Sequence, residues 1–165
     1  LLSRRQRQMC IRDRNKSVSF NSNDVSQPSG VTVYHMKKAL LGTAMHSFAE
    51  AFVQAEQEYG VNAFFLAGVV SLESGWAKSE RARNGSNNLT GHAVYNDTSV
   101  GTYFSSYTEC VLITARDIAR DYLSPNGIYN NGLSVDGVNT KYSASADWDI
   151  KVTEIAYSLL SKANS

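Results

Sequence analysis

The sequence has little material for metal or disulfide chemistry. Its 165 residues include two cysteines, Cys10 and Cys110, and three histidines, His35, His46 and His92. The histidines are scattered along the chain, and no Cys/His cluster has the spacing of a zinc site. One cysteine, Cys10, lies in a segment that is set aside below, which leaves a lone cysteine for the rest of the chain. We therefore expect neither a bound metal nor another cofactor.

Long apolar runs and a high charge content are also missing. No apolar run reaches the ~20 residues that span a bilayer, so we expect no insertion into a membrane. Charged residues make up 19% of the chain, less than the ~25% of an average protein. With 42% hydrophobic residues, the chain is long enough to bury the core of one domain. A monomer is expected.

The first 14 residues, LLSRRQRQMCIRDR, stand apart from the rest of the sequence. They contain five arginines, no glycine or proline, and no apolar stripe at helical spacing. They also lack the apolar region of a signal peptide. The segment resembles a translated sequencing-adapter read, and the missing initiator methionine fits a truncated gene, so residues 1–14 are interpreted as an artefact. The alternative interpretation is a basic arm that binds nucleic acid.

Setting residues 1–14 aside changes the charge of the chain. Five arginines and one aspartate are removed, so Lys+Arg falls from 16 to 11 and Asp+Glu falls from 15 to 14. The net charge changes from +1 to −3. A mildly acidic domain is not expected to have nucleic acid as its main partner.

The remaining chain divides into a polar lead-in and a folded domain. Residues 15–30 read NKSVSFNSNDVSQPSG, a Ser/Asn-rich stretch with a proline and a glycine. Such a composition is typical of linkers, so residues 15–40 are expected to form a linker or a poorly ordered lead-in. Residues 41–165 are expected to form the folded domain.

Apolar residues at three- and four-residue steps predict helices in that domain. The first two cover residues 45–59 and 63–74, and each is followed by a glycine that would end it. Asn62 is a suitable N-cap for the second helix, which is apolar nearly all round and should be the buried central helix. Residues 106–122 open with a Ser-x-x-Glu capping box, and residues 148–159 carry a further apolar stripe.

Residues 89–104 have a different pattern. They read LTGHAVYNDTSVGTYF and are rich in Thr, Val and Tyr around an Asn-Asp-Thr-Ser turn. This composition predicts a small β-hairpin lobe. The sequence as a whole therefore predicts the α+β class, mostly helical with one small β lobe.

A single carboxylate, Glu73, closes the apolar central helix in the stretch SLESGWAKSE. Burial favours the protonated form of an acid and raises its pKa, as a glycosidase's general acid requires. The alternative is a structural role, as a cap or as an ion-pair partner of Lys78 or Arg81. Three residues later, Trp76 either packs in the core or stacks on a sugar ring.

Several ordered motifs resemble one family. They are Glu-Ser-Gly-Trp-Ala at 73–77, Asn-Asn-Leu-Thr-Gly at 87–91, YFSSYTECVLITARDIARDYL at 103–123 and VNTKYSASADWDIKV at 138–152. Together they resemble the glucosaminidase domain of glycoside hydrolase family 73, over about residues 40–162. Members are bacterial and phage peptidoglycan hydrolases with a lysozyme-like fold.

The resemblance implies an endo-β-N-acetylglucosaminidase that cleaves the glycan strands of peptidoglycan after N-acetylglucosamine. Glu73 matches the family's general acid, and Asn88 falls in the loop beside the cleft, where it would contact substrate. Tyr142 matches a tyrosine near the catalytic glutamate, although a core tyrosine is the alternative. Such a substrate implies a location outside the cytoplasmic membrane, in the cell wall or after delivery by a phage. A muramidase, a lytic transglycosylase and a wall-binding phage tail module are the alternatives.

The sequence departs from the family pattern in three motifs, at four residues. Ala77 replaces a glycine, so the turn after the tryptophan is expected to avoid positive φ at this residue. Thr90 replaces a phenylalanine, and Ser145-Ala146 replaces an Asp-Pro pair. None of these changes removes a group that we assign to catalysis.

The second catalytic group is the least defined part of this prediction. Asp97, in the turn of the predicted β lobe, is a candidate base, although an aspartate there often serves the turn itself. Glu109 sits in the capping box and is expected to be structural. The substrate's own acetamido group, oriented by Tyr142, is the alternative to a protein base. Tyr95 and Trp148 are further candidates for the cleft wall, with packing roles as their alternatives.

Overall fold

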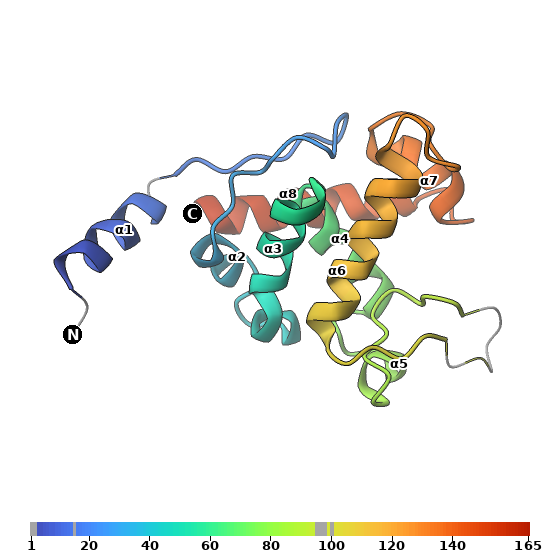
Figure 1. Ribbon diagram of the computed structural model, residues 1–165, viewed down its shortest axis with the longest axis horizontal. Helices are drawn as coiled ribbons and strands as arrows, with labels where there is room; N and C mark the ends of the chain where they lie inside the picture. Colours follow the sequence, from blue (N-terminus) through green and yellow to red (C-terminus); the bar gives the residue numbers. More distant parts are fainter. Residues whose placement is uncertain (1–2, 15, 95–98, 100) are drawn as a thin grey trace.

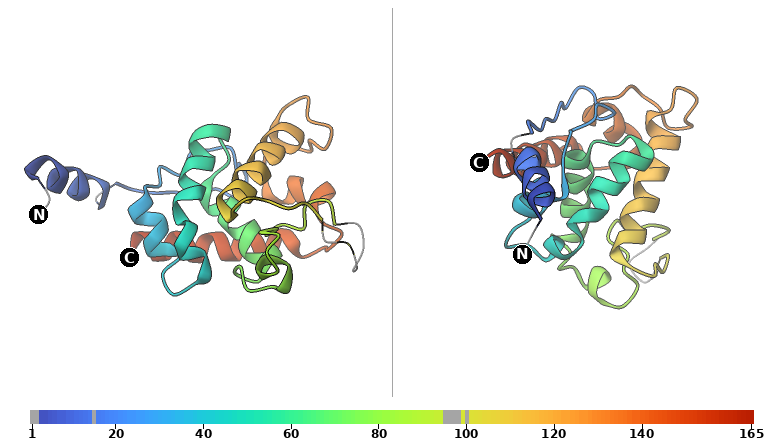
Figure 2. Two further views of the ribbon diagram at one scale, coloured as in Figure 1. Left: turned by 60° about the horizontal axis from the view of Figure 1, so that its bottom comes forward. Right: turned by 60° about the vertical axis from the view of Figure 1, so that its left-hand side comes forward.

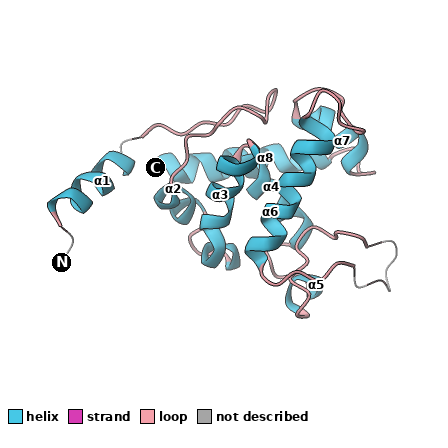
Figure 3. Ribbon diagram, viewed as in Figure 1, coloured by secondary structure: helices cyan, strands magenta, loops and turns pink. Residues whose placement is uncertain are grey.

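The computed structural model describes residues 3–14, 16–94, 99 and 101–165. Within these ranges the chain is helical, and Figure 3 shows no strand in them. The helical elements in chain order are α1 (Arg4–Arg14), α2 (Val33–Ala39), the 3₁₀ turn η1 (Ala44–Phe48), α3 (Ala49–Tyr59), α4 (Ala63–Ser74), α5 (Glu80–Arg83), α6 (Tyr107–Ile118), the π-helical turn η2 (Ala119–Leu123), α7 (Val135–Tyr142) and α8 (Trp148–Asn164).

Helix α4 is the buried centre of the fold, as its sequence predicts. Nearly all of its residues are buried, because it is apolar on every side. The Asn62 side chain caps its start by accepting hydrogen bonds from the N–H groups of Phe64 (3.0 Å) and Phe65 (3.3 Å). Gly75 ends it in the left-handed conformation, at φ 55°. Both predicted boundaries of this helix are confirmed.

Helices α4 and α8 cross at very short range. In Figure 1, α8 runs behind the other helices, and it packs against α4, α2 and α7. A Cβ atom built on Gly68 of α4 would lie 2.9 Å from the carbonyl oxygen of Val152 on α8. The glycine therefore allows an approach that any larger residue would prevent. This crossing brings the start of α8 to the end of α4, where Glu73 lies.

Helix α6 packs against α3 and carries the predicted cap at its start. Ser106 accepts a hydrogen bond from the N–H of Glu109 at 3.1 Å. The carboxylate of Glu109 in turn accepts one from the N–H of Ser105 at 2.5 Å, and hydrogen bonding from Ser105 lowers the pKa of this carboxyl group. Glu109 thus has the structural role that its position predicts.

The expected lead-in contributes to the packed core. Residues 16–32 have no regular secondary structure, yet Val18, Phe20, Val25 and Val31 are buried. The N–H of Val25 donates to the carbonyl of Leu133 at 2.8 Å, and its own carbonyl accepts from Asn62 at 2.8 Å. This differs from the expected linker because a few apolar residues, spaced among serines and asparagines, are enough to anchor an extended segment.

The β-hairpin predicted for residues 89–104 is not found in the described part of this segment. The side chain of Asn88 accepts from the N–H of His92 at 2.9 Å and donates to its carbonyl at 3.0 Å. The Asn87 amide donates to the carbonyl of Phe104 at 2.9 Å. Asparagine side chains thus share the bonding of this segment with backbone bonds, such as the one from the N–H of Thr102 to the carbonyl of His92 at 2.9 Å. The α+β class with a β lobe is corrected to a helical fold for the described residues.

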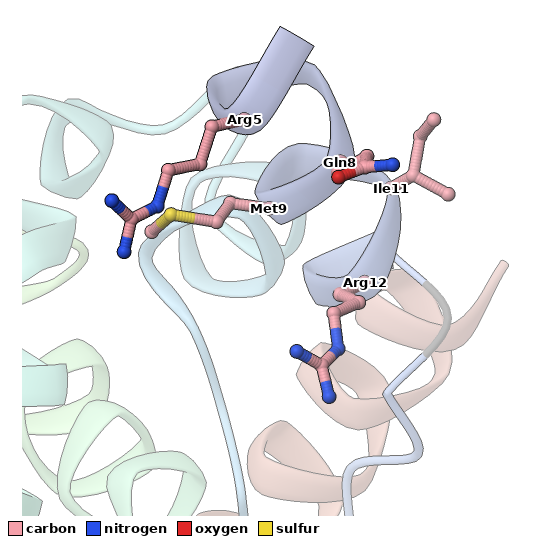
Figure 4. A pocket seen from close by; sticks show the side chains of 5 residues that line it. All are labelled: Arg5, Gln8, Met9, Ile11 and Arg12. Carbon is pink, nitrogen blue, oxygen red and sulfur yellow. The ribbon is translucent and has the colours of Figure 1, made fainter.

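Helix α1 projects from the end of the molecule (Figures 1 and 2). Its last arginine, Arg14, lies with its guanidinium carbon 5.4 Å from the centre of the Tyr34 ring on α2. Figure 4 shows Arg5, Met9 and Arg12 projecting from one side of the helix, and these residues line a shallow hollow. The hollow contains none of the residues predicted to form the site.

Candidate active site

Glu73 lies in the last turn of α4, with its side chain partly buried. Its Oε1 atom accepts a hydrogen bond from the indole N–H of Trp148, with an N···O distance of 2.8 Å. Trp148 is the first residue of α8 and is only 3% exposed. The crossing of the two helices therefore fixes one oxygen of the carboxyl group in place.

The surroundings of Glu73 favour its protonated form. Burial raises the pKa of its carboxyl group above the ordinary value, while the Trp148 hydrogen bond and the positive charge of Arg81 lower it to a smaller extent. The positive charge of Arg81 therefore acts on Glu73, but burial has the larger effect. The net result is a carboxylic acid that keeps its proton at higher pH than an exposed glutamate.

Tyr142, at the end of α7, completes a cluster with these two residues. Its ring centre lies 4.9 Å from that of Trp148. Burial and then the negative charge of Glu73 raise the pKa of its hydroxyl well above the ordinary value of 10. The hydroxyl is therefore protonated near neutral pH and can donate a hydrogen bond. The structure thus brings Glu73 and Tyr142 together, two residues that the sequence places 69 positions apart.

A pocket of about 220 Å³ adjoins this cluster and shares Tyr142 with it. Its walls come from the loop after α5, from α6 and its π-helical turn, and from the segment before α7. It combines three tyrosine rings with carboxylates and hydroxyls. The lining residues are Thr90, His92, Thr114, Asp117, Ile118, Asp121, Tyr122, Tyr129 and Tyr142.

Ion pairs hold the polar edge of this pocket. The Nε2 atom of His92 lies 3.1 Å from Asp117, and Arg116 lies 3.0 Å from the same carboxylate. Arg120 joins the two acids, at 3.2 Å from Asp117 and 2.6 Å from Asp121. The pocket therefore presents carboxylate oxygens whose charge is largely balanced by neighbouring cations.

The turn after α4 contradicts the expectation for Ala77. Gly75, Trp76 and Ala77 follow one another at φ 55°, 61° and 62°, so the alanine does adopt positive φ. Its N–H donates to the hydroxyl of Ser74 at 2.8 Å, and its methyl group is buried. This local bond and the burial hold an alanine where glycine is favoured. The Trp76 side chain is half-buried against the core and does not line the pocket.

The other predicted site residues have separate positions. Asn88 is buried, and its amide is bonded to the backbone of His92 at both ends, so it shapes the loop beside the pocket. Tyr95 and Asp97 lie outside the described residues. The role of Trp148 as the hydrogen-bond donor to Glu73 was missed, because its place on the apolar stripe of its helix indicates packing. An indole N–H in a buried position was the available signal, since it requires an acceptor.

Within the described ranges, no group of three or more His, Cys, Asp or Glu side chains could hold a metal ion. No helix in those ranges is long and apolar enough to cross a membrane.

The sequence matches a known protein family over most of the folded domain. The model of the family Glucosaminidase, described as mannosyl-glycoprotein endo-beta-N-acetylglucosaminidase, matches residues 49–161. Two proteins of Streptococcus pneumoniae, strains TIGR4 and R6, are provisionally named endo-beta-N-acetylglucosaminidase and are 26% identical over 106 residues. That region is 63% of this chain, but the chain spans only 16% and 15% of the length of these relatives.

Solved structures share the fold. Autolysin E of S. aureus in complex with the muropeptide NAM-L-Ala-D-iGlu has a TM-score of 0.69 and 18% identity, covering 92% of this chain and 76% of that one. A catalytic mutant of the same protein in complex with the disaccharide NAG-NAM has a TM-score of 0.69 at 17% identity, covering 90% and 75%. The catalytic domain of the autolysin Auto from Listeria monocytogenes has a TM-score of 0.58 at 14% identity, covering 98% of both chains. The chain therefore has the lysozyme-like fold.

Proposed function

The chain belongs to the glucosaminidase family of glycoside hydrolases, and from that premise we propose that it cleaves the glycan strands of peptidoglycan as an endo-β-N-acetylglucosaminidase. The observation that carries the proposal is the position of Glu73, a partly buried carboxyl group with one oxygen fixed by Trp148. A pocket lined by tyrosines and carboxylates shares Tyr142 with the cluster around Glu73. This is the arrangement that a general acid needs beside a sugar-binding cleft.

Glu73 is the proposed general acid. Its raised pKa keeps the proton on the carboxyl group until it is transferred to the glycosidic oxygen, as the bond from that oxygen to the anomeric carbon breaks. The carboxylate that remains is stabilised by the indole N–H of Trp148 and by the positive charge of Arg81. The two interactions that oppose the raised pKa therefore favour the proton transfer once it begins.

Tyr142 is the proposed orienting group at the anomeric carbon. Tyr142 is near enough to Glu73 for the carboxylate charge to raise the pKa of its hydroxyl, and this protonated hydroxyl can donate a hydrogen bond to the acetamido group of the sugar. If that acetamido group attacks the anomeric carbon, the product retains its configuration; if Asp97 activates a water molecule, the configuration inverts. Nuclear magnetic resonance of the first-formed product anomer distinguishes the two routes.

The proposed substrate also sets the proposed location. Peptidoglycan lies outside the cytoplasmic membrane, so the protein would act in the cell wall, in the extracellular space, or after delivery by a phage.

The identity of the new sugar end tests the proposed bond. Purified peptidoglycan is digested, reduced with borohydride and analysed by mass spectrometry. Reduced N-acetylglucosamine ends are expected. Reduced N-acetylmuramic acid ends would identify a muramidase, and anhydro-muramic ends a lytic transglycosylase. Binding to the wall by the folded protein without any new ends would identify a binding module.

A further inference from the structure

A row of aromatic rings leads from Glu73 to the surface. Trp148 donates to the carboxyl group, and its ring centre lies 4.9 Å from that of Tyr142. Tyr142 lies 5.5 Å from Tyr122, which lies 5.2 Å from Tyr129. The three tyrosines all line the pocket, which Tyr142 links to the cluster around Glu73, and Tyr129 at the outer end is 41% exposed. The row therefore connects the reacting acid to solvent along one wall.

A π-helical turn places Tyr122 in this row. Helix α6 does not end at Ile118 but continues into the wider turn Ala119–Leu123, closed by a hydrogen bond from Ser124 N–H to the carbonyl of Ala119 at 2.9 Å. A π-helical turn accommodates one more residue than an α-helical turn, is rare, and is often found at functional sites. Here the wider turn directs both Asp121 and Tyr122 to the pocket.

The following loop fixes Tyr129 against that turn. The N–H of Tyr129 donates to the carbonyl of Asp121 at 2.9 Å, and the Asn130 side chain donates to the carbonyl of Tyr122 at 2.7 Å. A Cβ atom built on Gly127 would lie 2.4 Å from the Asp121 carbonyl oxygen, so only glycine allows the loop to fold back this closely. The exposed tyrosine is therefore held in place before any ligand binds.

The chemistry of this wall fits a sugar ring. A pyranose has apolar C–H faces that pack on aromatic rings and hydroxyls that donate to carboxylates. The pocket supplies tyrosine rings and, at its edge, the carboxylates of Asp117 and Asp121. Arg116 and Arg120 pair with these acids, so the pocket edge presents carboxylate oxygens without a large excess of negative charge.

We propose that Tyr122 and Tyr129 form a sugar-binding subsite for an N-acetylhexosamine of the glycan strand. This inference rests on the proposed function. This sugar is a neighbour of the one that reacts at Glu73, and Tyr142 lies between the two. The subsite binds the strand and takes no part in bond breaking. It therefore determines how tightly a long strand is held, and it favours strands over isolated disaccharides.

Binding to the Glu73→Gln variant tests the subsite without turnover. The probe is the β-1,4-linked tetrasaccharide of N-acetylglucosamine, measured by isothermal titration calorimetry. Adding Tyr129→Ala should weaken binding roughly 3- to 10-fold, the effect of losing one aromatic contact. Tyr129→Phe should keep most of the affinity, because the ring remains. Tyr157→Ala is the matched control, since Tyr157 is 43% exposed, contacts the Phe20 ring at 4.9 Å and lies outside the pocket.

Kinetics on solubilised glycan strands gives a second readout in the otherwise unchanged protein. Tyr129→Ala should raise KM by a similar factor and leave kcat unchanged, as loss of uniform binding does. Gly127→Ala should have the same effect, because its methyl group displaces the loop that carries Tyr129. The double variant should be no worse than Gly127→Ala alone, since both changes remove the same contact.

Two results overturn the subsite. One is a Tyr129→Ala variant with the same affinity and KM as the Tyr157→Ala control. The other is a Tyr129→Ala variant with lower kcat and unchanged KM. In both cases the parent still produces N-acetylglucosamine ends, so the proposed function stands. If the folded parent produces no new ends and the Glu73→Gln variant binds no tetrasaccharide, the proposed function fails and the subsite fails with it.

Discussion

Glu73 combines two requirements that usually conflict. A buried carboxylate is costly, yet an acid catalyst must be able to lose its proton during the reaction. In this protein burial raises the pKa of Glu73, and Trp148 and Arg81 supply the opposing stabilisation of the charged form. The site thus favours the protonated form of Glu73 and also provides partners for the carboxylate that would form during the proposed reaction.

This balance predicts the effect of Glu73→Gln on stability. Because the folded pKa is raised, the native state binds more protons than the unfolded state, so the glutamate lowers stability as pH rises above the ordinary value of 4.5. Glutamine is neutral and keeps an oxygen for Trp148, so the variant should melt at a higher temperature than the parent at neutral pH. The difference should vanish at acid pH, where the glutamate is also neutral. Thermal unfolding across this range checks the prediction, and a variant that melts lower at pH 7 would contradict it.

The Trp148 hydrogen bond predicts a shift in the pH profile. Trp148→Phe removes the donor that stabilises the Glu73 carboxylate, so the pKa of Glu73 should rise further. The alkaline limb of kcat/KM should move to higher pH, and kcat/KM at neutral pH should fall about 10-fold or more, the cost of losing a hydrogen bond to a charged group. Trp76→Phe is the control and should leave the limb in place. If the alkaline limb of the Trp148→Phe variant stays at the same pH or moves to lower pH, Trp148 does not stabilise the Glu73 carboxylate.

The partial burial of Glu73 could be predicted from the sequence, because this carboxylate closes a helix that is apolar nearly all round. The donor to Glu73 could not, because helical spacing shows that Trp148 faces the core but not what its N–H meets there. For Ala77 the sequence-based prediction was wrong, because it excluded positive φ at this residue. The general preference of positive φ for glycine is correct, but the hydrogen bond to Ser74 and the buried methyl group override it here.

At the scale of elements, the crossing of α4 and α8 positions the residues of the candidate site. Gly68 contacts Val152 at the point where the helices are closest, and Glu73 contacts Trp148 further along the same pair. The two contacts are parts of one packing arrangement. A substitution that changes the distance between the helices should therefore alter the position of Glu73 relative to Trp148, even when the substituted residue does not contact the site.

Gly68→Ala tests this coupling. Alanine favours a helix by about 1 kcal/mol over glycine, but its methyl group would lie 2.9 Å from a backbone oxygen and overpack the crossing, at a cost of about 1–3 kcal/mol. The variant should melt at a lower temperature and lose activity as α8 moves away from Glu73. Calorimetry and peptidoglycan digestion measure the two effects. Full activity in a variant more stable than the parent would show that the helix crossing can accommodate a methyl group, and would contradict the predicted coupling.

The helices could be predicted where the sequence carries explicit end signals. Asn62 and Ser106 cap helices as predicted, and Gly60 ends α3 in the left-handed conformation. The β-hairpin prediction was wrong for the described residues because it rested on the strand preference of Thr, Val and Tyr, which does not reveal the side-chain bonds of Asn87 and Asn88 to the backbone of this segment. The π-helical turn has no such signal, since it depends on how the loop behind it packs.

At the scale of the whole molecule, the two N-terminal segments have opposite roles. Residues 16–32 lie along the folded domain and bury apolar side chains in its core, with Val25 fully buried. Helix α1 projects away and exposes Met9 and Ile11. Composition alone could not separate them, because the lead-in is rich in polar residues while a few well-placed apolar residues anchor it.

This contrast makes a prediction about stability. Deleting residues 1–14 should leave the melting temperature and the activity unchanged, because α1 touches the body mainly near Tyr34. Val25→Ala should lower the free energy of unfolding by about 2 kcal/mol, because it leaves a cavity in the core. Chemical denaturation measures both. Equal losses from the deletion and from Val25→Ala would show that α1 is part of the folded domain.

The central claim is that Glu73 is the catalytic acid of a peptidoglycan hydrolase, and one paired digest tests it most directly. The parent and the Glu73→Gln variant, each shown to be folded by circular dichroism, are incubated with the same peptidoglycan, and the release of reducing ends is measured over time. The parent should release N-acetylglucosamine ends, and the variant should be slower by about 10²–10⁴-fold. Equal rates from the two proteins would contradict the account, because the proton would then come from another residue.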